Sequence, residues 1–193
     1  MTRLLTALLL IFTSATVSAS DAWVLVDTQR QEIRVFEDGY EVLHLPRIAI
    51  GRGGVSELRQ RGDRTTPLGE FRVAWINEDS DFHLFFGLDF PHFSHARMAY
   101  NQGLMEQEEY FSVIDAVRDR RLPPQRTSVG GHIGIHGIGD GDRNLHNRAN
   151  WTQGCVAVTN DEMDELAGFV DVGTRVVITA EEDITALLSS YDR

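Results

Sequence analysis

The chain of 193 residues contains a single cysteine, Cys155, behind an amino-terminal segment typical of exported proteins. Arg3 is followed by an apolar run over residues 4–12 and by the small residues Val17-Ser18-Ala19, which is the pattern of a cleaved signal peptide. We expect cleavage after Ala19. An uncleaved anchor is the alternative, but the run is shorter than the roughly 20 residues that span a bilayer. An exported chain with one cysteine cannot close an internal disulfide, so a partner or a reaction uses the thiol.

The remaining length and the charge limit the class of protein. Removing 19 of 193 residues leaves 174, which suits one domain and is too short for two. We assign residues 1–19 to the signal peptide, 20–180 to the domain and 181–193 to an acidic helix or tail. The net charge of −11 makes a nucleic-acid partner unfavourable. Residues 47–72 hold six arginines, which we interpret as a solvated face, with a basic rim near an anionic substrate as the alternative.

Local patterns predict a mainly β fold with inserted helices (α+β). Short runs rich in β-branched and aromatic residues predict strands over residues 22–27, 32–36, 41–50, 69–76, 131–136 and 174–179. The first two strands are expected to form a hairpin across the turn at 28–31. Helices are predicted over residues 94–100, 106–120, 161–170 and 181–190, the first capped by Ser94 and the third opened by a capping box of Thr159 and Glu162.

Cys155 and His136 are the candidate nucleophile and base. A cysteine attacks carbonyl groups as the thiolate, and a histidine takes its proton at neutral pH. His136 ends a predicted strand 19 positions before Cys155. Gly137 and Gly154 remove side chains from the approach to this pair. The backbone N–H groups of Gly154 and Cys155 are candidates for an oxyanion hole.

Cys155 also has two less reactive interpretations. An isolated cysteine is often a small buried hydrophobic residue, but this one follows the polar segment Trp151-Thr152-Gln153 rather than an apolar run. A zinc site would need His132, His136 and His146 together with Cys155. The sequence has neither His-Glu-x-x-His nor Cys-x-x-Cys, so we expect no metal and no other cofactor.

Several ordered motifs resemble one known family. The segment Ile133-Gly134-Ile135-His136-Gly137, followed by Thr152-Gln153-Gly154-Cys155-Val156, is similar to the signature of L,D-transpeptidase catalytic domains, bacterial enzymes that cross-link peptidoglycan through a catalytic cysteine. Residues 62–71 resemble the family's glycine-aspartate, threonine-proline and aromatic segment. Residues 160–166 and 172–176 resemble its closing helix and strand, so the likeness covers about residues 22–180.

The resemblance implies a β-sandwich of mixed sheets and an acyl-transfer mechanism. His136 would deprotonate Cys155, and the backbone carbonyl of Gly137 would orient the imidazole. The thiolate would attack a stem tetrapeptide of peptidoglycan, expel D-alanine and leave a thioester. The amine of a second stem then gives a cross-link, a lipoprotein amine gives an anchor, and water gives a trimmed tripeptide.

The motif also departs from the common family pattern of serine-histidine-glycine-cysteine-isoleucine-arginine. Thr152 keeps the hydroxyl of the serine, whereas Gln153 and Ala157 replace the second histidine and the arginine. We therefore expect substrate contacts from Thr152, Trp151, Arg143 and Arg148, the two arginines standing in for the missing one.

The resemblance and the export signal together imply an exported, monomeric L,D-transpeptidase, periplasmic or associated with the cell wall, that acts in cell-wall organisation and cell shape. One alternative is a peptidoglycan hydrolase of the same fold, either an L,D-carboxypeptidase or an amidase-like enzyme. The other is a non-enzymatic domain that binds the wall.

Overall fold

The protein is described by a computed structural model that covers residues 22–181 and 184. The predicted signal peptide and most of the predicted acidic helix over 181–190 lie outside these residues. None of the helices in the described ranges is long and apolar enough to cross a membrane.

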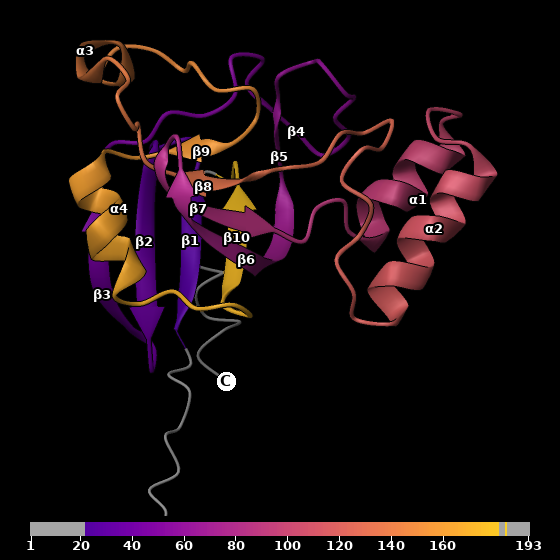
Figure 1. The fold of residues 1–193 in the computed structure, drawn as a ribbon, viewed down its shortest axis with the longest axis horizontal. Coiled ribbons are helices and arrows are strands. Elements are labelled where there is room, and N and C mark those ends of the chain that lie inside the picture. The colour runs from indigo at the N-terminus through magenta and orange to yellow at the C-terminus, as the bar shows by residue number, and fades with distance from the viewer. Residues whose placement is uncertain (1–21, 182–183, 185–193) are drawn as a thin grey trace, which may run out of the picture.

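The described residues form a mainly β structure of mixed sheets, as predicted (Figure 1). Its strands are β1 (Trp23–Asp27), β2 (Glu32–Glu37), β3 (Tyr40–Leu45), β4 (Val55–Ser56), β5 (Thr66–Pro67), β6 (Gly69–Ser80), β7 (His83–Leu88), β8 (Gly134–His136), β9 (Val156–Ala157) and β10 (Arg175–Thr179). Eight of them are hydrogen-bonded in the order β3-β2-β1-β10-β6-β7-β8-β9, and β4 pairs with β5. The β1–β10 and β8–β9 pairs are parallel.

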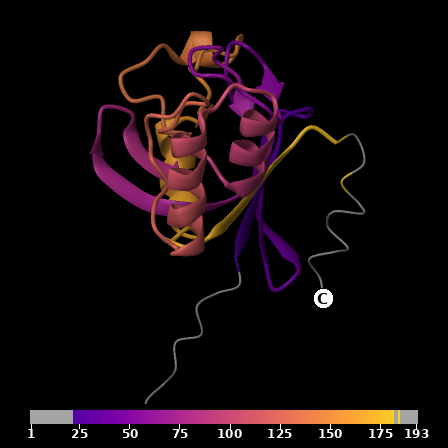
Figure 2. The same cartoon turned by 90° about the vertical axis from the view of Figure 1, so that its right-hand side faces the viewer.

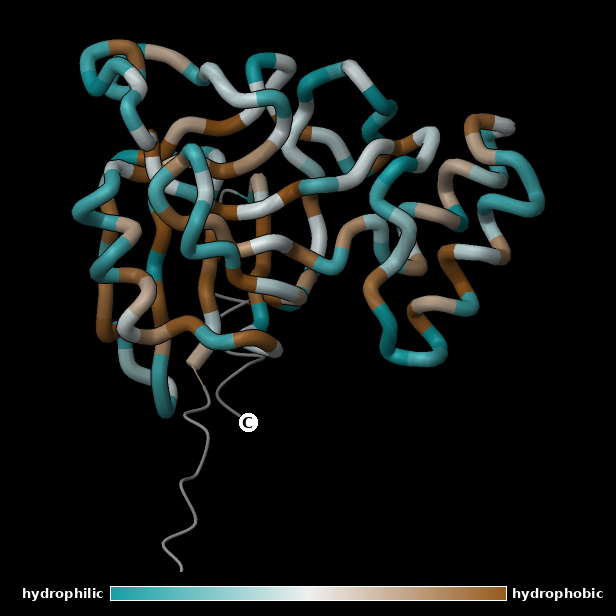
Figure 3. The backbone as a smooth tube through the Cα atoms, viewed as in Figure 1, coloured by the Kyte–Doolittle hydropathy of each residue, from teal (hydrophilic) through white to brown (hydrophobic). Residues whose placement is uncertain are grey.

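The long strand β6 joins the two halves of the large sheet. Its first residues pair with β10, and from Val73 onward it pairs with β7 through two register shifts. Such bulges bend a strand. One hydrophobic cluster contains Val24 and Val35 from one half together with Phe86 and Ile135 from the other, so the halves face each other across the core. In Figure 1, β7 and β8 cross in front of β1 and β10, and Figure 3 shows apolar residues along the strands and polar residues along the outer loops.

The predicted hairpin at the start of the domain is confirmed. Strands β1 and β2 are antiparallel, with Asp27 paired to Glu32 across the turn. One carboxylate oxygen of Asp27 accepts hydrogen bonds from the backbone amides of Gln29 and Arg30, at 3.0 and 2.9 Å. This aspartate turn closes the hairpin without glycine.

The prediction of one strand over residues 41–50 is wrong in its second half. Strand β3 ends at Leu45, because Pro46 has no N–H to donate to a ladder. The chain then turns, and Ala49 forms two backbone hydrogen bonds with Ala157 of β9, at 2.7 and 2.9 Å. This segment therefore lies beside the loop that carries Cys155. Strand β7 was not predicted.

Four helices occur in the described residues: α1 (Phe93–Asn101), α2 (Gln107–Arg118), α3 (Arg143–His146) and α4 (Asn160–Ala167). Helices α1 and α2 stack through Tyr100 and Tyr110 and project from one side of the sheet (Figures 1 and 2). The cap of α1 is His92 and not the predicted Ser94. The capping box that opens α4 is present, and α4 contacts β7. Helix α3 was not predicted.

Candidate active site

The parallel pairing of β8 and β9 brings His136 and Cys155 to one place. His136, the last residue of β8, is in register with Ala157 of β9, and Cys155 immediately precedes β9. Alternate residues of an extended chain point to the same face, so Cys155 and His136 share a face of this pair. No hydrogen bond joins the thiol to the imidazole in the described part of the chain. Catalytic contacts often tighten only when substrate binds.

The backbone carbonyl of Gly137 fixes the imidazole of His136. Nδ1 lies 2.6 Å from this oxygen. A carbonyl oxygen can only accept, so Nδ1 carries the hydrogen and Nε2 keeps its lone pair. His136 is therefore held in the tautomer that can take a proton at Nε2. This contact is the one predicted from the sequence for Gly137.

Aromatic rings surround His136. The ring of Phe82 lies 4.4 Å from the imidazole, that of Phe85 is stacked at 5.9 Å, and Trp151 meets it edge-on at 5.8 Å, all between centroids. Burial lowers the pKa of His136 below 6.5. The hydrogen bond to the Gly137 carbonyl raises this pKa in part, and the nearby His146 lowers it further. The imidazole is therefore neutral at pH 7 and available as a base.

The thiol of Cys155 is held in its protonated form. Burial raises its pKa to about 11, while a hydrogen bond from the Gly134 backbone and the charge of Arg59 act in the opposite direction. The sulfur donates a hydrogen bond to the carbonyl of His132 at 3.4 Å. With this pKa, about one thiol in 10⁴ is ionised at pH 7. Formation of the thiolate near neutral pH therefore calls for a base that takes the proton.

The hydroxyl of Thr152 organises the loop around the cysteine. Thr152 is 3% exposed; its Oγ1 donates to the carbonyl of Cys155 at 2.6 Å and accepts from the amide of Gly154 at 3.1 Å. The Gly154 amide, a predicted oxyanion-hole donor, is thus engaged in this conformation. The amide of Cys155 has no hydrogen-bond acceptor within the described residues, which makes it the freer donor of the two.

The other predicted substrate contacts have separate positions. Trp151 packs on His136 and donates from Nε1 to Nδ1 of His146 at 3.4 Å. Arg143 and Arg148 are exposed, and Arg143 lies 4.0 Å from Asp161. Within the described ranges, neither arginine is hydrogen-bonded to Cys155. Gln153 is exposed.

Arg59 was not predicted as part of the site, and His146 was predicted only as a possible zinc ligand. Both are buried beside the site, and Arg59 belongs to the arginine-rich run interpreted as a solvated face. The alternative interpretation of residues 47–72 as a basic rim included Arg59, but the sequence spacing did not distinguish Arg59 from the other arginines of this run. Among the described residues, no three His, Cys, Asp or Glu side chains are placed to hold a metal ion.

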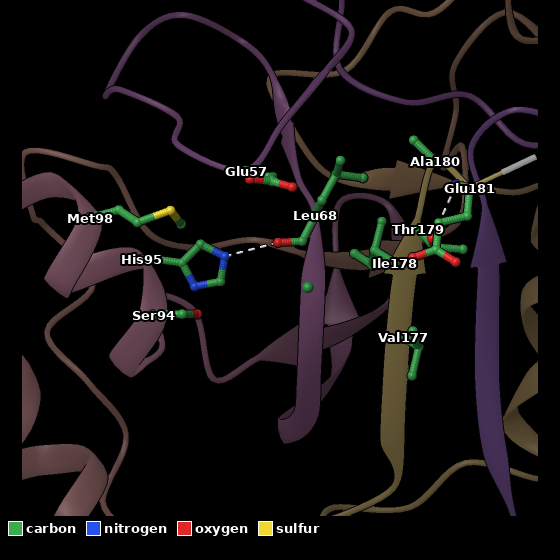
Figure 4. Close-up of a pocket in the computed structure, with 11 residues that line it drawn as sticks. Glu57, Leu68, Ser94, His95, Met98, Val177, Ile178, Thr179, Ala180 and Glu181 are labelled. Atoms are coloured by element: carbon green, nitrogen blue, oxygen red, sulfur yellow. Dashed lines mark hydrogen bonds between the residues drawn. The ribbon is translucent and has the colours of Figure 1, made fainter. Parts of the chain in front are cut away.

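A cavity of about 460 Å³ lies away from this pair, between α1 and the end of β10 (Figure 4). Neither Cys155 nor His136 lines it. Its wall includes Glu57, Ser94 and His95, and the imidazole of His95 is hydrogen-bonded to the carbonyl of Leu68 at 2.9 Å. The cavity is therefore not the space in front of the candidate nucleophile.

The buried histidines predict a loss of stability in mild acid. Burial lowers the pKa of His95, His136 and His146 below their ordinary value of 6.5. On acidification the unfolded chain therefore binds protons first, so this part of the stability is complete above pH 6.5 and is lost as pH falls through the lower folded values. We expect the free energy of unfolding, measured in urea, to decrease as the pH falls from 7 to 5. An unchanged midpoint would contradict these burial assignments.

Together, the fold and these residues define a mixed β-sheet domain with a cysteine and an oriented, neutral histidine at the ends of adjacent strands. The model of the L,D-transpeptidase catalytic domain family, YkuD, matches residues 21–178. The chain therefore belongs to the L,D-transpeptidase catalytic domain family.

Solved structures show the same fold. Bd1075 from Bdellovibrio bacteriovorus is 19% identical with a TM-score of 0.56, and the match covers 93% of this chain and 55% of that one. The helical cell shape determining protein Pgp2 from Campylobacter jejuni is 23% identical with a TM-score of 0.56, covering 84% and 48%. The chain thus spans about half the length of these two structures. No curated protein sequence matches.

Proposed function

We propose that this protein is an exported cysteine L,D-transpeptidase that acts on the stem peptides of peptidoglycan in cell-wall cross-linking or remodelling. The observation that carries the proposal is the neutral imidazole of His136, oriented by Gly137 with Nε2 unprotonated. It lies at the end of β8, whose partner strand β9 begins directly after Cys155. The family match supports the substrate class.

In the proposed mechanism, Nε2 of His136 takes the thiol proton of Cys155. The thiolate attacks the carbonyl carbon of the third stem residue, and the Cys155 amide stabilises the oxyanion. When the tetrahedral intermediate collapses, the C–N bond to D-alanine breaks and His136 returns its proton to the leaving amine. The thioester then transfers the acyl group to an amine of a second stem or of a lipoprotein, and Cys155 is regenerated.

Trp151 and Thr152 support this reaction in different ways. Trp151 and Phe82 form part of the wall over His136 and would border the bound peptide. Thr152 holds the Cys155 loop through two hydrogen bonds, so we assign it a positioning role. Arg143 and Arg148 are exposed and remain candidates for contacts with the glycan or the stem.

The test is incubation of the mature protein, residues 20–193, with purified disaccharide-tetrapeptide, followed by mass spectrometry. A dimer that lacks one D-alanine is the expected product. If the monomeric tripeptide is the sole product, the protein is a hydrolase of the same fold and not a transpeptidase. The variant Cys155→Ala is the matched negative control and should give neither product. If the folded wild-type protein also gives neither, the enzymatic proposal fails and a wall-binding domain takes its place.

A further inference from the structure

Arg59 is a buried cation whose charge is poorly compensated. The residue is 4% exposed, and its Nε and Nη1 have no hydrogen-bond partner among the described residues. Asp63 is 3.9 Å from Nε, beyond hydrogen-bond distance, and the ring of Phe90 lies 5.7 Å from the guanidinium carbon. Burial of an arginine without hydrogen bonds is costly. Such an arrangement calls for another negative group nearby.

Asp63 is only a partial counter-ion because its carboxylate is occupied by its own turn. One oxygen accepts from the amide and the hydroxyl of Thr65, at 2.9 and 3.0 Å. The other accepts from the amide of Gln60 at 2.6 Å. The carboxylate therefore closes the loop and is not directed at Arg59.

The guanidinium lies against the residue that precedes the nucleophile. A Cβ atom built on Gly154 would be 2.6 Å from Nη1 of Arg59, and one built on Gly130 would be 3.4 Å from Nη2. The two glycines belong to the chain on either side of β8, so Arg59 fills the space between these segments. Glycine at 154 lets the cation approach the backbone of the Cys155 loop.

We propose that Arg59 is the internal cation that stabilises the thiolate of Cys155, and that it acts as a positioning residue for the nucleophile. This inference rests on the proposed function of Cys155. When Nε2 of His136 accepts the proton, negative charge develops on the sulfur, and the uncompensated guanidinium attracts it through the low-dielectric interior. Arg59 itself exchanges no proton.

The charges acting on the two groups agree with this role. The positive charge of Arg59 opposes the burial that raises the pKa of Cys155, and Cys155 and Asp63 both oppose the burial that lowers the pKa of Arg59. His136, at the end of β8, is neutral at pH 7 and carries a charge only after proton transfer. On the adjacent strand β7, His83 is paired with Asp164 at 2.7 Å. His146, the last residue of α3, acts on His136 and accepts a hydrogen bond from Trp151.

The test is the pH profile of Cys155 alkylation by iodoacetamide, followed by intact mass. Arg59→Met removes the charge and keeps an apolar chain, so the profile should move to higher pH. A displacement of the profile by one pH unit corresponds to a rate at pH 8 that is about tenfold slower. Arg59→Lys keeps the charge and should restore most of the rate. Asp63→Asn removes the competing anion and should move the profile to lower pH. Arg61→Gln, an exposed neighbour, should leave it unchanged.

Wild-type profiles for both Arg59→Met and Asp63→Asn would overturn the inference, and Arg59 would then be structural. If Arg59→Met does not fold, the inference is tested by Asp63→Asn alone, for which the alkylation profile should move to lower pH. Iodoacetamide reacts without any peptidoglycan substrate. If the proposed function fails, no product forms from the tetrapeptide, but alkylation of Cys155 still depends on Arg59. If this inference fails, the products form and alkylation of Cys155 does not depend on Arg59.

Discussion

His136→Gln is expected to lower the rate of product formation from tetrapeptide by about 10²–10⁴-fold, the usual contribution of a general base. Burial raises the pKa of Cys155 to about 11, so almost no thiolate exists at pH 7 without a base. Glutamine can still donate to the carbonyl of Gly137, but it cannot take a proton. Alkylation of Cys155 near neutral pH should slow as well.

Two further measurements make the His136 prediction specific. Wild-type activity should fall on the acid side below pH 6.5, because the lowered pKa of His136 keeps the imidazole neutral down to that range. This acid limb should be absent from the residual activity of His136→Gln. The control is His44→Gln on β3, an exposed histidine paired with Glu32 at 2.9 Å, which should turn over like wild type. An unchanged alkylation rate in His136→Gln would mean that His136 does not activate the thiol.

Gly154→Ala is expected to reduce the free energy of unfolding by about 2–6 kcal/mol. Its φ of +129° is strained for any residue with a Cβ, which costs of order 1–3 kcal/mol. The new methyl group would also lie 2.6 Å from both Nη1 of Arg59 and the carbonyl oxygen of Thr65, and such overpacking costs about 1–3 kcal/mol more. Urea unfolding at pH 7 measures the loss.

The matched control separates strain from crowding. Gly173 also has a positive φ, +101°, but a Cβ there would meet nothing within 4 Å. Gly173→Ala should therefore show only the strain component and cost less than Gly154→Ala. Equal losses for the two variants would show that the Cys155 loop is free to move away from Arg59. The crowding component should also reduce Cys155 alkylation, because the crowded loop carries Cys155.

The elements with strong local signals were predicted well. The β1–β2 hairpin and the capping box of α4 follow from nearest neighbours in the sequence, namely the polar turn after Asp27 and the pair Thr159 and Glu162. The prediction of a strand over 41–50 was wrong because the apolar pattern continues past Pro46. The hydrogen-bond ladder ends there, since proline has no N–H to donate. Strand β7 was missed because its pairing with β6 and β8 is fixed by the tertiary structure.

The sequence by itself determined which groups are the candidates for the chemistry: one cysteine, a histidine at a strand end, and glycines beside both. The acid–base properties of these residue types, and their order along the chain, do not depend on distant contacts. The tertiary structure alone decided what surrounds them. It directed the Thr152 hydroxyl to its own loop, left Arg143 and Arg148 exposed, and buried Arg59 against Gly154. Burial and charge compensation arise between segments far apart in the chain, so no local pattern encodes them.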